Sequence, residues 1–187
     1  MVEQHTGFET VGVQITLGTG AQVTRHILID PARIQLPATN YPSETFEGLF
    51  YTLNFDKTTE ESAYSEEITY FRWKSGTDIE VVVDWLHDSV DAGVVVWGVE
   101  YKSIKAGEAV TGAGTKITKA SAGTHTAGQL VRTTFTLKIL GSALEAEDIL
   151  AVRFYRDTAD AADTLGEDAR MLNVHFHFTM DKLGEAI

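Results

Sequence analysis

The stretch "ILAVRFYRDTADAADTLGEDARMLNVHFHFTM", residues 149–180, decides the fold. Apolar and polar residues alternate at both of its ends, and an alternation with period two is typical of a strand that is buried on one face. The central part is rich in Asp and contains Gly, which favours a turn or loop. The stretch therefore predicts two strands joined by an acidic loop. Their inward side chains should be Leu150, Val152, Phe154, Val174, Phe176, Phe178 and Met180.

The same alternation recurs along most of the chain. The other strand-like runs are residues 23–30, 49–55, 63–73, 78–86, 94–101 and 132–140. Counted together, these runs predict about eight short strands. Two apolar sheet faces must cover each other. We therefore predict an all-β fold, a two-sheet antiparallel β-sandwich of the jelly-roll type.

The segments between these runs carry weaker signals. Residues 112–128 are rich in Gly, Thr and Ser and are expected to form a connection, while the run that follows should turn Phe135, Leu137 and Ile139 inward. Only residues 142–148 and part of 160–169 are compatible with helices, and both are too short for an independently stable helix. Helix is expected to be a minor ingredient.

The first 22 residues differ from the rest of the chain. They are polar and contain four glycines that interrupt a weak alternation. We therefore predict an extended N-terminal arm over residues 1–22 and one β-sandwich domain over residues 23–187, a length that is sufficient for a single core. No stretch approaches the roughly 20 apolar residues of a membrane span, and the N-terminus has no basic start, so neither insertion nor secretion is expected.

Composition excludes several classes of function. The formal net charge is −12, which disfavours a nucleic-acid partner because such proteins neutralise phosphates with Lys and Arg. The chain contains no cysteine, which excludes disulfides, thiolate nucleophiles and cysteine-ligated metal centres. Neither a Gly-x-Ser-x-Gly elbow nor a phosphate-binding Gly-rich loop occurs. Carboxylate pairs could in principle serve glycoside hydrolysis, but the sequence alone cannot place any pair across a cleft, so a glycosidase is a third alternative without named residues. We predict a non-enzymatic protein with no catalytic residue and no obligatory cofactor.

The acidic loop has two interpretations. Its carboxylates could supply oxygen ligands to Ca²⁺, although their spacing does not follow the EF-hand pattern. The calcium candidates are Asp157, Asp160, Asp163 and Asp168. In the other interpretation, the loop is a surface turn whose first carboxylates pair with Arg153, Arg156 or Arg170.

His175 and His177 form a His-x-His pair whose rings should leave one face of a strand. This spacing suits a metal, but the flanking glycine and glutamate of a cupin motif are missing. Because Phe176 and Phe178 take the inward face, we place the histidines on the outer face or in an oligomer contact, with metal binding as the alternative.

The three tryptophans raise the possibility of sugar stacking. Trp85 and Trp97 share strand faces with valines, which is typical of core aromatics. Trp73 lies next to "KSG" at a strand end, so it is the tryptophan that we expect to be exposed and able to meet a ligand or partner.

Two further motifs carry a resemblance to a family. The segments "VVWGVEY" and "LAVRFYRDTADAADTLGEDARMLNVHF", with "LPATNYP" and "LNFDKTTEESAYSEEITY" before them, resemble the jelly-roll-like structural virion proteins of tailed bacteriophages, of the small capsid-decoration, fibre or appendage type. The likeness spans residues 36–180, so the first 35 residues have no counterpart. Within this span, the loop over residues 104–130 departs from the family pattern. The matching loop positions are Arg156, Asp157, Asp163, Thr164, Leu165, Gly166, Asp168, Ala169 and Leu172.

The resemblance implies a structural role in a virion. The chain would dock on other capsid or tail proteins through its arm and form a homo-oligomer, a trimer being frequent among virion appendages. Under this hypothesis the acidic loop defines the fold, with Arg156 as its anchor. The alternative is a carbohydrate-binding module that stacks a glycan, such as one on a host surface, on Trp73, Tyr64 or Tyr70 and holds a structural Ca²⁺ in the acidic loop.

Overall fold

The computed structural model describes residues 8–11, 14–69, 72–90 and 92–183. Within these residues the regular structure consists of strands and three short 3-10 turns, without any α-helix. The segment 142–148 contains only the end of the turn η3 (Gly141–Ala143), and the segment 160–169 is an irregular loop that leads into a strand. No helix of the described part of the chain is long and apolar enough to cross a membrane.

The larger sheet has six strands in the order β10-β7-β12-β5-β4, with β3 also paired to β12. The strands are β3 (Val23–Ile29), β4 (Ser43–Glu47), β5 (Phe50–Phe55), β7 (Glu80–Leu86), β10 (Val131–Thr134) and β12 (Ala169–Met180). All pairings are antiparallel. The long strand β12 organises this sheet, because β5 pairs with its first residues and β3 with its last ones.

The smaller sheet has four antiparallel strands in the order β6-β11-β8-β9. They are β6 (Ser62–Ile68), β8 (Val94–Ile104), β9 (Thr115–Ala122) and β11 (Ile149–Arg156). The prediction of a plain connection over 112–128 is wrong, since β9 lies within it. β9 is an edge strand with Ile117 as its buried apolar residue, so it lacks the apolar alternation that reveals the other strands.

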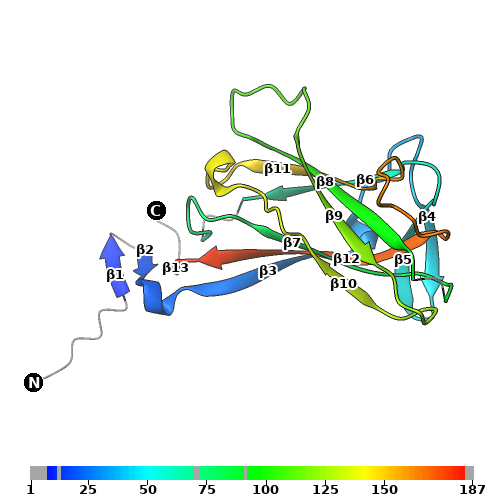
Figure 1. Ribbon diagram of the computed structural model, residues 1–187. Helices are drawn as coiled ribbons and strands as arrows, with labels where there is room; N and C mark the ends of the chain where they lie inside the picture. Colours follow the sequence, from blue (N-terminus) through cyan, green and yellow to red (C-terminus); the bar gives the residue numbers. More distant parts are fainter. Residues whose placement is uncertain (1–7, 12–13, 70–71, 91, 184–187) are drawn as a thin grey trace, which may run out of the picture.

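The two sheets pack face to face and enclose one core (Figure 1). Aromatic rings link the layers: Phe154 lies 6.3 Å from Phe176, and Trp97 lies 5.3 Å from Phe55 and 6.0 Å from Trp85 between ring centroids. The predicted all-β antiparallel sandwich is therefore confirmed, and so is the burial of Trp85 and Trp97.

Most of the predicted inward side chains are buried. All seven residues predicted to face inward from β11 and β12 belong to the core. In the run 132–140, Phe135 and Ile139 are buried, but Leu137 is 58% exposed, so its predicted burial is wrong. Regular pairing of β10 ends at Thr134, and beyond that point the period of two no longer determines the direction of a side chain.

The predicted N-terminal arm contains a β-hairpin. Strands β1 (Phe8–Val11) and β2 (Gln14–Leu17) pair antiparallel, and β2 also pairs with β13 (Lys182–Leu183). This small sheet lies beyond one end of the sandwich (Figure 1). Residues 1–7 and 12–13 of the predicted arm lie outside the described residues. The described part of the arm is thus joined to the C-terminal end of the chain by strand pairing.

Candidate functional site

The outer face of the larger sheet carries the candidate site. On β7, Val81, Val83 and Trp85 face the core, so the alternating residues Glu80 and Asp84 face away from it. The same rule turns His175 and His177 of β12 outward between the buried Val174, Phe176 and Phe178. The predicted outer-face position of the two histidines is confirmed.

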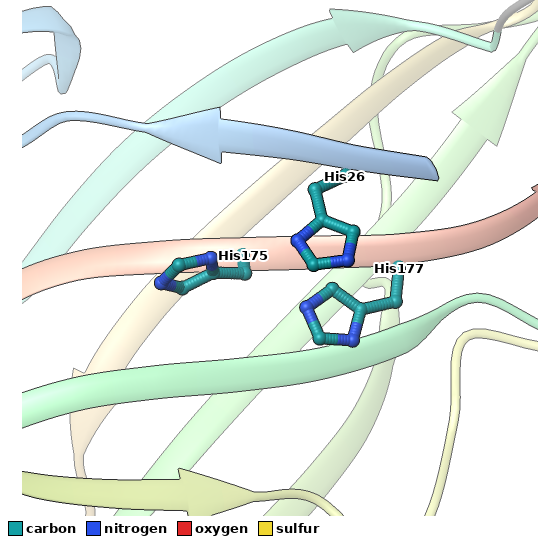
Figure 2. Close-up of side chains that lie close together, drawn as sticks. All are labelled: His26, His175 and His177. Atoms are coloured by element: carbon teal, nitrogen blue, oxygen red, sulfur yellow. The ribbon is translucent and has the colours of Figure 1, made fainter. Parts of the chain in front are cut away.

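A third histidine joins this pair from the other end of the chain. His26 on β3 is the direct cross-strand partner of His177, because β3 and β12 are antiparallel neighbours. The rings of His26 and His177 stack with centroids 4.0 Å apart, and the ring of His175 lies 5.9 Å from that of His177. Figure 2 shows the ring of His26 over that of His177, with one nitrogen of each ring on the side of His175. We call these three residues the histidine cluster.

Two carboxylates of β7 hold the rings of the β12 histidines. Nε2 of His175 lies 3.0 Å from Oδ2 of Asp84, and Nδ1 of His177 lies 3.1 Å from Oε2 of Glu80. An ionised carboxylate only accepts hydrogen bonds, so these ring nitrogens are the donors. The opposite nitrogens, Nδ1 of His175 and Nε2 of His177, therefore carry a free lone pair whenever the rings are neutral.

Asp84 connects the histidine cluster to β10. Its carboxylate accepts hydrogen bonds of 2.7 Å from both Nε and Nη2 of Arg132. Burial raises the pKa of Asp84, but the hydrogen bonds from Arg132 and His175 outweigh burial, so the net pKa lies below its usual value. Asp84 is consequently a fixed negative charge between the guanidinium and the imidazole.

A groove of about 820 Å³ extends along the same face. It begins at Asp84 and Arg132 and runs towards the hairpin of β4 and β5. Its lining is mainly apolar: Leu28, Pro31, Leu49, Phe50, Tyr51, Leu86, Leu130 and Leu172. Burial, and then the hydrogen bond to Glu44, raises the pKa of Tyr51 to about 12, so its phenol stays neutral. The groove combines mainly apolar walls with the Asp84–Arg132 pair at one end, and Asp30 and Glu47 also line it.

The groove has an apolar rim. Leu49 is 96% exposed and Phe50 64% exposed, and both lie at the tip of the β4–β5 hairpin, where Gly48 adopts a left-handed φ of 60°. Phe46 on β4 and Leu130 before β10 are also exposed. Contiguous apolar side chains on the surface of a soluble domain usually mark a contact with another molecule.

The acidic loop is a structural device. Arg156 is fully buried, and its guanidinium binds both carboxylate oxygens of Asp163 and donates to the carbonyl oxygens of Leu165 and Glu167, each at 2.7 Å. Oδ2 of Asp163 also accepts the backbone N–H of Val96 at 2.9 Å. The loop is thereby fastened to the beginning of β8, in agreement with the predicted role of Arg156 as its anchor.

Three of the four calcium candidates have separate side-chain partners. Asp163 is paired with Arg156, and Asp168 accepts hydrogen bonds from the backbone N–H of Lys57 at 3.0 Å and from the side chain of Asn54 at 3.1 Å. Asp160 accepts the backbone N–H of Ala162 within the loop. Among the described residues, the histidine cluster is the group of potential ligands whose atoms converge. The structure does not bring Asp157, Asp160, Asp163 and Asp168 together.

The prediction that Trp73 is exposed is wrong. Trp73 is 1% exposed and donates its indole N–H to the carbonyl oxygen of Thr77 at 3.0 Å. Trp73 forms an isolated bridge with Met180, the last residue of β12, and its side chain belongs to the core. The position of Trp73 at the end of a strand-like run does not reveal this pairing. Tyr64 is 41% exposed on β6, and Tyr70 lies outside the described residues.

The predictions from the sequence did not identify His26 or the groove. They also did not identify Glu80 and Asp84 as hydrogen-bond acceptors of the histidine rings. The available signal was the alternation of residues 23–30, which places His26 on the face opposite to Ile27 and Ile29. The alternation does not say which strand lies next to residues 23–30. In the structure that neighbour is β12, the last strand of the larger sheet along the chain.

No protein-family model and no curated protein matches the sequence. Solved structures with a similar fold include PorU from Porphyromonas gingivalis (10% identity, TM-score 0.43, 86% of this chain and 13% of that one). CBM35 of Abf62 from Cellvibrio japonicus is similar at 11% identity and a TM-score of 0.49, over 86% and 97% of the two chains. A chain of infectious bursal disease virus, Gx strain, is similar at 12% identity and a TM-score of 0.33, over 86% and 32%. Such likeness concerns the β-sandwich alone, since one fold serves many functions.

Proposed function

We propose that this chain is a non-enzymatic structural component of a bacteriophage virion, of the capsid-decoration or fibre type, and that it assembles as a homo-oligomer. The observation that carries the proposal is the apolar rim of Leu49 and Phe50 beside an apolar groove on the same sheet face. The motif resemblance of residues 36–180 supplies the virion context. The anchoring of the acidic loop on the buried Arg156 supports a structural rather than a catalytic role for the most distinctive motif.

The occupant of the groove is a second copy of the chain. A symmetric contact needs a protruding and a receiving element on one surface, so that each copy gives to its partner what it receives. The β4–β5 hairpin tip supplies the protruding element, and the groove beside it supplies the receiving one. Burial of a Leu and a Phe from each partner contributes roughly 1.5–3 kcal/mol per side chain, which offsets part of the cost of association.

The mass of the untagged full-length chain in solution, measured by light scattering across a dilution series, tests this assembly. We expect an oligomer that dissociates in the variant Leu49→Ser/Phe50→Ser. The matched control is Val110→Ser, since Val110 is 73% exposed but lies in the distant loop after β8. A monomeric full-length chain, or a double variant with unchanged mass, contradicts the proposed contact. Virion particles lacking the chain should be less stable to heat; unchanged particles contradict the virion role.

The groove favours one alternative function, glycan binding. Exposed aromatic rings next to hydrogen-bonding charges are the usual elements of a sugar site, and the groove places Phe50 and Tyr51 on the same surface as the Arg132–Asp84 pair. The burial of Trp73 removes the stacking residue first expected for this function. Calorimetric titration with a glycan panel, using the wild type and Tyr51→Ala, distinguishes the two functions: saturable heat that the variant loses supports the alternative.

A further inference from the structure

The histidine cluster gathers three potential metal ligands on one sheet face. The antiparallel pairing of β3 and β12 sets His26 opposite His177, and the period of two sets His175 on the same face as His177. One ring nitrogen from each of the three residues lies within 4.8 Å of the other two. Around a tetrahedral ion with metal–nitrogen bonds of about 2.1 Å, such nitrogens are about 3.4 Å apart. Small side-chain rotations therefore suffice to close the site.

The carboxylates next to the cluster suit metal binding. A histidine that binds a metal commonly donates its second ring N–H to a carboxylate, which fixes the tautomer and orients the ring. Asp84 accepts from Nε2 of His175, and Glu80 accepts from Nδ1 of His177. Asp84 is itself oriented by two hydrogen bonds from Arg132. Two of the three rings are thus already held with the ligating nitrogen free.

We propose that His26, His175 and His177 bind one divalent transition-metal ion of the imidazole-preferring class, for which Zn²⁺ is the probe. Imidazole ligands select Zn²⁺, Cu²⁺ and Ni²⁺ over Ca²⁺ and Mg²⁺, which require oxygen. His26 is exposed, and the side chains of His175 and His177 are 18% and 23% exposed, so the ion is accessible from solvent. The fourth ligand is a water molecule or a group from another molecule.

The ion links the two ends of the main domain. His26 belongs to β3, the first strand of the larger sheet along the chain, and the other two ligands belong to β12, the last one. Binding to the folded state alone stabilises a protein in proportion to the logarithm of the ligand concentration over the Kd. The metal should therefore raise the melting temperature by fastening β3 to β12.

Isothermal titration calorimetry with ZnCl₂ tests the site on the full-length chain, without a polyhistidine tag and after removal of metals with EDTA. We expect one Zn²⁺ per chain and a higher melting temperature in its presence, with no competition from excess Ca²⁺. His26→Gln should weaken binding by more than the ~10–100-fold that the loss of an outer-shell partner costs, and Glu80→Gln should weaken it within that range. Circular dichroism of each variant confirms that the fold is kept.

The matched control is His125→Gln. His125 lies in the loop between β9 and β10, and its ring contacts the carbonyl oxygen of Val90. This variant should bind Zn²⁺ as the wild type does. The absence of stoichiometric binding at micromolar Zn²⁺ overturns the proposal. So does unchanged Zn²⁺ affinity in His26→Gln, since the ion would then lie on the acidic surface elsewhere. Replacement of Zn²⁺ by Co²⁺ adds a spectroscopic readout. Imidazole ligation alters the visible absorption of Co²⁺, and we expect this change in the wild type and in His125→Gln but not in His26→Gln.

Discussion

The acidic loop and the histidine cluster differ in how their polar groups are used. In the loop, acidic residues follow one another closely in the sequence, yet their carboxylates bind Arg156, backbone N–H groups and neighbouring turns. In the histidine cluster, residues from opposite ends of the chain converge, and two of the rings retain a free nitrogen. Acidic residues that lie close together in the sequence thus form a structural loop, whereas histidines from strands far apart in the sequence form the candidate site.

The largest expected effect comes from breaking the centre of the loop. Arg156→Ala leaves the carboxylate of Asp163, which is 3% exposed, without its charge partner and leaves the carbonyl oxygens of Leu165 and Glu167 without this donor. Breaking a buried ion pair costs about 3–5 kcal/mol of unfolding free energy. Urea denaturation followed by tryptophan fluorescence measures it. The control Glu167→Gln changes a loop side chain exposed to solvent and should stay within about 0.5 kcal/mol of the wild type.

Asp168→Ala should have a smaller effect. The substitution removes the acceptor of the Lys57 N–H and of the Asn54 side chain, but both lie near the surface, where water replaces the lost partner. We expect a loss of about 1 kcal/mol in the same denaturation assay. A loss as large as that of Arg156→Ala would mean that Asp168, and not the buried ion pair, anchors the loop.

Acid should weaken the turn that faces the loop. The hydrogen bond from the Thr58 side chain, followed by those from the backbone N–H groups of Thr58 and Thr59, lowers the pKa of Asp56 from 3.8 to about 2. A carboxyl whose pKa is lowered by folding stabilises the folded state above its unfolded pKa. This contribution is lost as the pH falls from about 4 to about 2. Urea midpoints over that range should fall less steeply for Asp56→Ala than for the wild type; parallel curves would contradict the assignment.

Calcium should have the smallest effect of all. Since Asp160, Asp163 and Asp168 have separate partners and the four aspartates form no converging group of ligands, adding CaCl₂ or EDTA is expected to leave the melting temperature of the wild type unchanged. Differential scanning calorimetry under both conditions measures it. A rise with Ca²⁺ that Asp160→Ala abolishes would show that the loop rearranges around an ion, and the contrast with the histidine cluster would fail.

Much of the fold could be predicted because alternation is a local property. Side chains on a strand point to opposite faces in turn, so the apolar residues of β11 and β12 identified their own inward face without knowledge of any partner. The same reasoning placed Trp85 and Trp97 in the core and the His175–His177 pair on the outer face. It missed β9, whose strand character depends on hydrogen bonds to β8 more than on apolar residues.

The candidate site could be predicted only in part. The resemblance and the residue pattern identified Arg156 as the anchor of the loop, and the hydrogen bonds agree. The exposure of Trp73 was predicted from a strand-end position, but burial depends on which segments cover that end. The groove needs the β4–β5 hairpin beside β3 and β10, an arrangement that no single segment encodes.

The sequence by itself determined the β class and the strand faces, because these properties depend on neighbours one or two residues away. Its lack of cysteine also excludes cysteine chemistry. Only the tertiary structure decided that β3 lies beside β12, with His26 opposite His177, and that the aspartates of the loop are kept apart. The physical reason is that strand order and register result from packing the whole core, and a shift of one residue would turn His26 to the other face of the sheet.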